Sequence, residues 1–563
     1  MTESSCDDSS SRHVHSRPEA DAGWPLVRRS LRRRGQPTRH AHGVRDTTLR
    51  NGAILKSTRF ATKFALLPLA LAGLVASIVP GSESLLLGDS LANARHPTDA
   101  VHYVHLALGL SSIACLILFS AWSRLVRASA IAVQHLATMS RFRFTALIAL
   151  AAATIRLPLV FVTPSVGASD PAWYHDAAMS LASGGGLSVA DTLTAYRPPG
   201  YPWALALLYG LFGVHLELVW LWSGVATIAL LVSVHSVARR LYGEQTARVA
   251  TLGVASFPSL VMFCGVPSSD LMFAAGLTAL LAVAVTRPTF GVVTTLVYGL
   301  VLGLLSLVRT EGLAFAAVFP VLWLLQYHSA SRLAIRTTLL AAAVLAPVLL
   351  WCVRNEVALG AFTPATNGGL NLLLGNNPDA TGGYPSTAAP VVSDIFSSDK
   401  SEGEKDELAF RAAMDFVQQH PVQWLCLLPR KLAHLFLDPE LSAAQWLFAD
   451  EGHSPAFKYS AYLVSEGAYL VLLALLGLRC LSWTGTGETP RGSQWTGYLV
   501  GAVGVFVTLV TFGQDRFRMP ILPWMLIEAA VVLVSTSASP RLEQNSETRP
   551  TALAFDSSER TEL

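Results

Sequence analysis

Hydrophobic segments of about 20 residues recur along most of the chain, and polar stretches of varying length separate them. A helix needs about 20 apolar residues to cross the hydrocarbon core of a bilayer. The pattern therefore predicts an all-α polytopic membrane protein with about 12 transmembrane helices. We expect these helices at 61–80, 102–122, 145–165, 218–237, 249–266, 270–287, 290–308, 312–327, 337–353, 460–480, 496–512 and 520–536.

Two long connections, 166–217 and 354–459, carry most of the polar residues between these segments. The stretch SDPAWYHDAAMSLASGGG, at 169–186, predicts a short helix over 170–183, with Asp170 as its N-cap, Pro171 next and three glycines as its stop. A second short helix is expected at about 200–213. Residues 403–437 predict two helices that lie at the membrane interface and break at Pro421.

Composition supports a membrane protein, because 52% of the residues are apolar, only 14% are charged and the mean hydropathy is +0.44. Residues 1–60 hold twelve Lys and Arg against six Asp and Glu, and they predict a disordered basic cytosolic tail. We do not expect a cleaved signal peptide there. The tail 537–563 is also predicted to be disordered and cytosolic. The six cysteines stand singly and predict small apolar side chains, with no disulfide or zinc spacing.

Basic residues in the short loops fall on the side of the N-terminal tail, which the positive-inside rule assigns to the cytosol. Both long connections then face outward. Several basic residues depart from the rule by lying outside, and they suggest a bound anion, although scatter alone would also place a few there. They are Arg197, Arg309, Arg354, Arg430, Lys431, Arg516 and Arg518.

A series of motifs follows in order along the chain: TAYRPPGYPWALALLYGLFG at 194–213, RRLYG at 239–243, VPSSDLMFA at 266–274, LVRTEGLAF at 307–315, TPATNGGLNLLLGNNPDATGGY at 363–384 and DRFRMPILP at 515–523. Together with the Asp and Tyr on the helix at 170, this order resembles the GT-C integral-membrane glycosyltransferases. These enzymes use polyprenyl-phosphate sugars and include protein O-mannosyltransferases and the lipid A aminoarabinose transferase. The resemblance covers 145–536, and two extra N-terminal transmembrane helices precede it within 61–144.

The resemblance implies that Asp170 and Asp270 are catalytic carboxylates, although capping a helix would also explain each of them. It implies that Arg197, Arg309, Arg516 and Arg518 hold the donor phosphate. Simpler interpretations exist for these too: Arg197 could snorkel toward lipid headgroups, and Glu311 could pair with Arg309. Substrate-binding residues are expected among Tyr174, His175, Asp176, Tyr196, Tyr201, Asn367, Asn371, Asn376 and Asn377.

By composition alone the Asn- and Gly-rich stretch that begins at Asn367 is a cluster of turns. Some relatives use a divalent metal near the acidic loop, so a divalent metal stays an open alternative here. No convincing set of metal ligands stands in this sequence, and no cofactor is certain. The implied reaction is displacement at an anomeric carbon by an acceptor hydroxyl, at the outer face of the plasma membrane. The expected partners are a polyprenyl-phosphate sugar, an acceptor glycan, lipid or protein, and membrane lipids, with no nucleic acid.

Three alternatives remain. A ligase or polymerase acting on a lipid-diphosphate glycan is the nearest. A transporter or lipid flippase would show charges near the bilayer midplane and paired broken helices, whereas this chain keeps the middle of its segments nearly free of charge. A membrane scaffold without catalysis is the third.

Overall fold

The computed structural model describes residues 128–161, 166, 169–287, 291–326, 330–385, 389–449, 454–486 and 490–537. The chain divides into Met1–Leu49 and Arg50–Leu563, and all described residues belong to the second unit. The predicted segments at 61–80 and 102–122 and the two predicted tails therefore lie outside the described residues, apart from Ser537.

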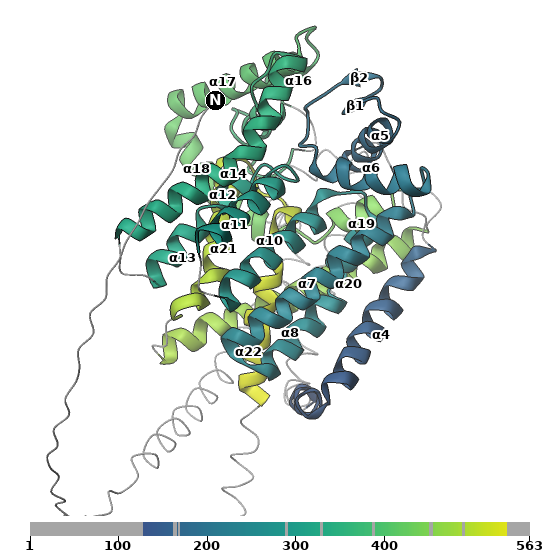
Figure 1. Ribbon diagram of the computed structural model, residues 1–563, viewed down its shortest axis with the longest axis vertical. Coiled ribbons are helices and arrows are strands. Elements are labelled where there is room, and N and C mark those ends of the chain that lie inside the picture. Colours follow the sequence, from purple (N-terminus) through teal and green to yellow (C-terminus); the bar gives the residue numbers. More distant parts are fainter. Residues whose placement is uncertain are drawn as a thin grey trace, which may run out of the picture. The chain divides into compact units, whose positions relative to one another are not determined.

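Six helices in the described part of the chain are long and apolar enough to cross a membrane (Figure 1). Five of them are α4 (Arg141–Val160), α7 (Leu218–Tyr242), α10 (Ser269–Thr286), α14 (Ala330–Leu359) and α20 (Pro455–Thr486), and the sixth joins η3 (Gly492–Gln494) to α21 (Trp495–Val510). The only described strands, β1 (Ser188–Val189) and β2 (Thr192–Leu193), pair as a short antiparallel ribbon. The helical class is thus confirmed.

The predicted number of about 12 spans is not confirmed. The described residues contain six candidate spans, or seven if one bent pair of helices is counted as a span. This pair joins α8 (Glu244–Ser256) to α9 (Pro258–Met262) and η2 (Phe263–Gly265) at an angle of 56°. Pro258 ends α8 because proline lacks an N–H and its ring clashes with the preceding turn. Arg156 Nη1 of α4 donates to Ala255 O (2.7 Å) beside this break. The predicted continuous helix over 249–266 is therefore wrong.

Three further predicted spans form helices that are shorter than a full span. They are α11 (Val292–Ser306), the pair α12 (Gly312–Phe315) and α13 (Val318–Gln326), and α22 (Leu522–Ser537). The α11 helix packs so tightly on α14 that a Cβ at Gly303 would lie only 2.4 Å from Val344 O. Small residues allow such close helix contacts within a membrane.

The long helices bury one side and leave the other apolar and exposed. Leu230, Phe273 and Leu302 are at most 1% exposed in the core that α7, α10 and α11 share. The opposite face of α7 carries a helical stripe of exposed apolar residues, Leu221, Val225, Ile228 and Val232. Such a stripe is typical of a surface that contacts lipid rather than water.

The two long connections form short helices that are not candidate spans. The first contains α5 (Asp170–Ala182) and α6 (Gly200–Phe212), in close agreement with the predicted bounds. The second contains α15 (Gly368–Gly375), α16 (Pro390–Phe396), α17 (Glu402–Gln419), α18 (Pro421–Leu437) and α19 (Ser442–Leu447), with the predicted break at Pro421. Glu402 ties the two connections together by accepting from Ala195 N (3.0 Å) and Thr366 Oγ1 (2.9 Å).

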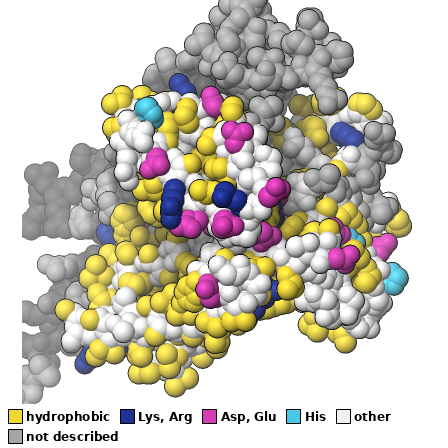
Figure 2. Space-filling model, turned by 90° about the horizontal axis from the view of Figure 1, so that it is seen from above, with side chains coloured by type: hydrophobic (Ala, Val, Ile, Leu, Met, Phe, Trp, Pro, Cys, Tyr) yellow, Lys and Arg dark blue, Asp and Glu magenta, His cyan; other side chains and the backbone are white. Residues whose placement is uncertain are grey.

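The outer surface of α16 and α17 is strongly polar. Figure 2 views this end of the described chain from above and shows charged side chains of both signs on it. The exposed charged residues within 390–419 are Asp394, Asp399, Lys400, Glu404, Glu407, Arg411 and Asp415. These charges are compatible with water on this side and not with lipid.

Residues 368–375 form the helix α15, so the prediction of turns for this stretch is wrong. Its glycines permit contacts that any side chain would block: a Cβ at Gly369 would lie 2.0 Å from Asp406 O, and one at Gly375 would lie 1.8 Å from Thr511 O. Asp406 Oδ1 also accepts from Gly369 N (2.6 Å) at the start of the helix. The glycines therefore serve packing, which holds α15 between α17 and the segment that leads into η4 (Asp515–Arg518).

Candidate active site

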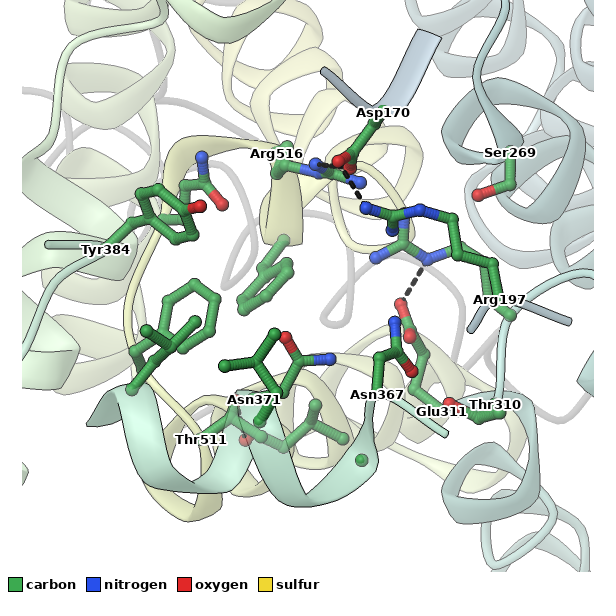
Figure 3. A pocket seen from close by; sticks show the side chains of 18 of the residues that line it. Asp170, Arg197, Ser269, Thr310, Glu311, Asn367, Asn371, Tyr384, Thr511 and Arg516 are labelled. Atoms are coloured by element: carbon green, nitrogen blue, oxygen red, sulfur yellow. Dashed lines mark hydrogen bonds and ion pairs between the residues drawn. The ribbon is translucent and has the colours of Figure 1, made fainter. Parts of the chain in front are cut away.

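A cavity of about 440 Å³ opens where the short outer helices meet the ends of the long ones (Figure 3). Its walls come from the start of α5, the residues before α6, the connection between α11 and α12, the helix α15, the end of α21 and the segment that leads through η4. Segments that lie far apart in the sequence thus contribute to a single cavity.

Asp170 borders this cavity as the first residue of α5. Ser169 occupies the N-cap position, and no side chain makes a capping hydrogen bond there, so the prediction of Asp170 as the N-cap is wrong. The Asp170 carboxylate instead accepts from two guanidinium groups: Oδ1 from Arg197 Nη2, and Oδ2 from Arg516 Nη1 at 2.6 Å (Figure 3). The carboxylate is therefore oriented by arginines and not by the helix backbone.

Asp270 lies behind the cavity wall, in the first turn of α10. Its side chain is only 1% exposed and accepts from Arg309 Nη1 and from Ser268 Oγ (2.7 Å). Ser268, and not Asp270, caps the helix. Arg516 Nη2 lies 3.5 Å from Asp270 Oδ2, so Arg516 connects the two predicted catalytic carboxylates. Asp270 itself does not line the cavity in the described structure.

The sequence RPPG places Arg197 beside the cavity. Gly200 N donates to Leu307 O (2.7 Å) at the end of α11, and a Cβ at position 200 would lie 2.7 Å from the same oxygen. Only glycine permits this contact, which brings the segment close to Arg309. The Arg197 guanidinium also lies 5.3 Å from the Tyr196 ring and 5.6 Å from the Tyr174 ring, within range of cation–π attraction.

Arg516 is held in place by the turn η4 that carries it. The neighbouring Asp515 accepts from Leu441 N (3.0 Å) and Ser442 N (2.8 Å), which fixes η4 to the start of α19. Trp446 on α19 then lies 4.6 Å from the Arg516 guanidinium. A planar cation stacked on an aromatic ring loses little freedom when it binds an anion.

The opposite charges at the site keep one another ionised. Burial raises the pKa of Asp170, but Arg516 and Arg197 outweigh this effect and hold the pKa below its ordinary value of 3.8. Burial lowers the pKa of Arg516, whereas Asp270 and Asp170 raise it above its ordinary range. Burial likewise lowers the pKa of Arg309, but Asp270 and Glu311 raise it overall. All these groups are ionised at neutral pH.

Two predicted tyrosines line the cavity, and the third supports them. Tyr174 and Tyr196 border the cavity, and the Tyr174 hydroxyl forms a hydrogen bond with Ser269 Oγ (2.9 Å). Tyr201 packs edge to face on Tyr174, with ring centroids 5.1 Å apart, and does not line the cavity. Its prediction as a direct substrate contact is not supported.

His175 and Asp176 also lie outside the cavity wall. His175 Nδ1 pairs with the Tyr209 hydroxyl (2.8 Å), and burial lowers the pKa of this histidine, so it is neutral at neutral pH. The helix α5 therefore presents its first residue and Tyr174 to the cavity, and places these two neighbours elsewhere.

The predicted asparagines divide into two pairs. Asn367 and Asn371 line the cavity. Asn376 and Asn377 do not, because their amides donate to the last carbonyls of α15: Asn376 Nδ2 to Leu372 O (2.7 Å) and Asn377 Nδ2 to Leu373 O (2.8 Å). Asn376 and Asn377 end the helix that carries the first pair.

Arg518 lies outside the cavity wall and is 1% exposed, so its predicted contact with a donor phosphate is not supported. Its Nη2 donates to Asp438 O (2.8 Å), its Nε lies 3.0 Å from Glu440 Oε1, and its guanidinium stacks 4.0 Å from the Tyr469 ring. Arg518 therefore fixes the position of η4 and leaves Arg516 as the cavity-facing arginine of the DRFRMP motif.

Sequence reasoning missed several residues of the cavity wall, among them Thr310, Glu311, Tyr384 and Trp446. The sequence predicts Glu311 only as a partner for Arg309. It is that partner, with Oε1 at 2.5 Å from Arg309 Nε, and it also faces the cavity. Within the described ranges no three His, Cys, Asp or Glu side chains come together in a group that could hold a metal ion.

Comparison with known proteins shows which enzymes part of the chain resembles. Residues 196–351 match a family model described as dolichyl-phosphate-mannose-protein mannosyltransferase. The match includes Arg197, Asp270 and Arg309, and it confirms the resemblance to polyprenyl-phosphate-dependent glycosyltransferases seen in the motifs. Among curated proteins, no sequence matches the chain.

Solved structures of two other proteins are among those that are similar to the chain. The archaeal oligosaccharyltransferase AglB from Archaeoglobus fulgidus, in complex with an inhibitory peptide and a dolichol-phosphate, is 12% identical with a TM-score of 0.41; the match covers 74% of this chain and 53% of AglB. ArnT from Cupriavidus metallidurans, bound to undecaprenyl phosphate, is 14% identical with a TM-score of 0.35, over 74% of this chain and 82% of ArnT. The chain thus spans about half the length of the oligosaccharyltransferase.

Proposed function

We propose that the protein is a membrane glycosyltransferase that moves a sugar from a polyprenyl-phosphate donor to a hydroxyl group of an acceptor. The observation that carries this proposal is the meeting of Asp170 with Arg197, Arg309 and Arg516 at one cavity. Transfer needs a group that takes a proton from the acceptor and fixed positive charges that hold the departing phosphate. The cavity offers both.

In the proposed reaction the acceptor oxygen forms a bond to the anomeric carbon while the bond from that carbon to the phosphate oxygen breaks. The phosphate leaves with the electron pair, and the acceptor proton passes to Asp170. The donor phosphodiester, which carries one negative charge, thereby becomes a phosphate monoester, and a second negative charge develops on the departing phosphate oxygen. Arg197, Arg309 and Arg516 stabilise this charge most strongly as it forms, which accelerates the reaction.

Donor binding would also make Asp170 a stronger base. In the resting site Arg516 and Arg197 bind its carboxylate directly and keep its pKa low. A donor phosphate competes for the same N–H groups, and each guanidinium that turns toward the phosphate weakens its hold on Asp170. The pKa of the carboxylate then rises toward its ordinary value. The base is thus strengthened only when a donor is present.

The charge balance of the site favours a monophosphate over a diphosphate donor. The three arginines face three carboxylates, Asp170, Asp270 and Glu311, each within ion-pair distance of at least one guanidinium. A single phosphodiester charge can be accommodated by partial release of Asp170. A diphosphate would add at least one further negative charge with no additional cation from the cavity wall.

The experiment that tests the function uses purified protein in liposomes with synthetic polyprenyl-monophosphate and polyprenyl-diphosphate sugars. Glycan, lipid and peptide acceptors are supplied in separate reactions, and release of the polyprenyl phosphate is followed. We expect turnover from a monophosphate donor with at least one acceptor class. Turnover from the diphosphate alone would indicate a ligase or polymerase, and no binding of polyprenyl phosphate at all would contradict the proposal.

We further propose that the cavity faces the outside of the plasma membrane, because it lies among the two long connections that the basic loops place outside. Single cysteines at Glu407 on α17 and at Arg239 at the end of α7 test this, since both side chains are more than half exposed. A membrane-impermeant thiol reagent should label Glu407→Cys in intact cells and spare Arg239→Cys. The reverse labelling would overturn the topology.

A further inference from the structure

One wall of the cavity is built from uncharged hydrogen-bonding groups and a single carboxylate. Figure 3 shows Thr310, Glu311, Asn367 and Asn371 together along the side away from Asp170 and Arg516 in that view, and we call these four residues the amide wall. They come from the connection after α11 and from the start of α15. All four side chains are partly exposed, which in this position means exposed to the cavity.

The amide wall has hydrogen-bonding capacity that the described residues leave unused. The side-chain amides of Asn367 and Asn371 make no hydrogen bond to any described residue, in contrast to Asn376 and Asn377 on the same segment. Glu311 engages Arg309 through Oε1, and its Oε2 has no partner among the described residues. These groups face the cavity, where hydroxyl groups of a ligand can replace water as their hydrogen-bond partners.

We propose that the amide wall binds the sugar of the donor through its hydroxyl groups and selects a sugar without charge. This inference rests on the proposed transferase function and names the substrate class of the same cavity. Each carboxamide offers donors and an acceptor, and a free carboxylate oxygen accepts from a hydroxyl. A sugar ring presents hydroxyls that act in both ways, so the two sets of groups are complementary.

The electrostatics of the wall explain the preference for a neutral sugar. Glu311 is the wall's one charged residue, and the 2.5 Å contact with Arg309 Nε already neutralises it. A carboxylate on the sugar, as in a uronic acid, would face Glu311 without a free cation. An ammonium group, as in an amino sugar, would meet only the second oxygen of the Glu311 carboxylate, whose charge Arg309 already neutralises. Either charged group would lose its water without gaining an adequate ion pair in the cavity. A sugar hydroxyl, in contrast, exchanges its hydrogen bonds to water for hydrogen bonds to the amide wall.

A purely structural role for Glu311, as a support for Arg309, makes a different prediction. Loss of that support would disturb the phosphate site and weaken every lipid phosphate equally. A sugar contact would instead affect only lipids that carry a sugar. The two roles are therefore separated by comparing polyprenyl phosphate with polyprenyl-phosphate hexose, which differ in the sugar alone.

The experiment measures binding of these two lipids, with a panel of neutral hexoses, to purified full-length protein and its variants. For Asn371→Ala we expect wild-type affinity for polyprenyl phosphate within about twofold. For Glu311→Gln we expect an affinity for polyprenyl phosphate that is no weaker than wild type, because Arg309 loses a competing carboxylate. Affinity for the preferred hexose lipid should fall about tenfold for each hydrogen bond lost. Glu407→Gln is the matched control, because it removes a carboxylate from an arginine pair that is exposed on α17 and outside the cavity wall.

Sugar charge is varied in the second arm. Wild-type protein should bind the hexose lipid more tightly than the matching uronic acid and aminohexose lipids, and Glu311→Gln should reduce the discrimination against the uronic acid. Equal weakening of both lipids by Glu311→Gln, or unchanged binding of both, would overturn the inference. Absence of polyprenyl phosphate binding by the wild type would instead overturn the proposed function, so the two failures are distinguishable.

Discussion

Replacement of Asp170 by Asn separates two roles of this carboxylate: the proposed role as a proton acceptor and the observed role as a partner of arginines. The substitution keeps the shape of the side chain but removes its charge and its ability to take a proton. We expect the transfer rate to fall by about 10² to 10⁴, the usual contribution of a general base. This corresponds to about 3–5 kcal/mol of activation free energy.

The effect on stability follows from the contacts of Asp170 with Arg197 and Arg516. Removing one partner of a buried ion pair costs about 3–5 kcal/mol. The carboxyl side chain is 16% exposed, and the Asn oxygen can still accept from one of the two guanidiniums, so we expect a loss of roughly 2 kcal/mol. The variant should therefore fold, with a lower melting temperature.

Donor binding should change in the opposite direction from the rate. In the wild type the carboxylate of Asp170 competes with the phosphate for Arg197 and Arg516, and in Asp170→Asn this competition is weaker. We expect the variant to bind polyprenyl-phosphate sugar at least as tightly as the wild type while it turns over far more slowly. Weaker binding at unchanged thermal stability would show that Asp170 contributes to donor recognition and not to proton transfer.

The assay is transfer in liposomes, run below the melting temperature of each variant and paired with binding of the donor. Asp176→Asn is the matched control, because it makes the same change on the same helix at a side chain that does not line the cavity. Near-normal turnover by folded Asp170→Asn would refute the assignment of the base, and equal losses in both variants would show that the effect is not specific to the cavity.

Three further predictions test the arrangement around this carboxylate. Arg197→Lys should retain part of the donor affinity and Arg197→Ala should lose it, whereas equal affinity of the Ala variant and wild type would remove Arg197 from the phosphate site. Burial raises the pKa of Asp170, but the arginines lower it below 3.8 overall, so protonation of Asp170 should not reduce kcat/KM at any pH above that value. In Arg516→Ala the fall of kcat/KM at acid pH should begin at a higher pH than in the wild type. An unchanged pH profile would contradict the pairing of Arg516 with Asp170. Gly375→Ala should cost at least about 1–3 kcal/mol, measured by thermal unfolding, because its Cβ would lie 1.8 Å from a backbone oxygen, while Gly368→Ala, whose Cβ meets no described atom within 4 Å, should be nearly neutral.

Local signals in the sequence predicted local structure well. The bounds of α5 and α6, the stop after α5 and the break at Pro421 all follow from proline and glycine positions within a few residues of each helix end. Hydrophobic length located helices at all ten predicted spans that fall within the described residues. It did not predict which of these helices are short, because the length of an apolar segment does not show where a break such as that between α12 and α13 interrupts it.

Tertiary contacts account for the errors. The stretch after Asn367 predicts turns because Gly and Asn are poor helix formers, yet close packing of Gly369 and Gly375 against other backbones stabilises a helix there. Arg516 and Arg518 stand two residues apart in one motif and are indistinguishable by sequence. Only the fold places the first against the cavity and encloses the second beside Tyr469.

The two aspartates show how the site depends on both levels. Each stands directly after a serine at the start of a helix, SD at 169–170 and SSD at 268–270, and in each case a serine and not the aspartate occupies the N-cap position. The positive end of the helix dipole stabilises a carboxylate in the first turn without using its oxygens as caps. Both carboxylates are then free to receive arginines from distant segments, and Arg516 reaches the two together. A carboxylate that capped its own helix would have fewer oxygen lone pairs left for the arginines that hold it at the cavity. The serine caps therefore leave both aspartates available for the catalytic role.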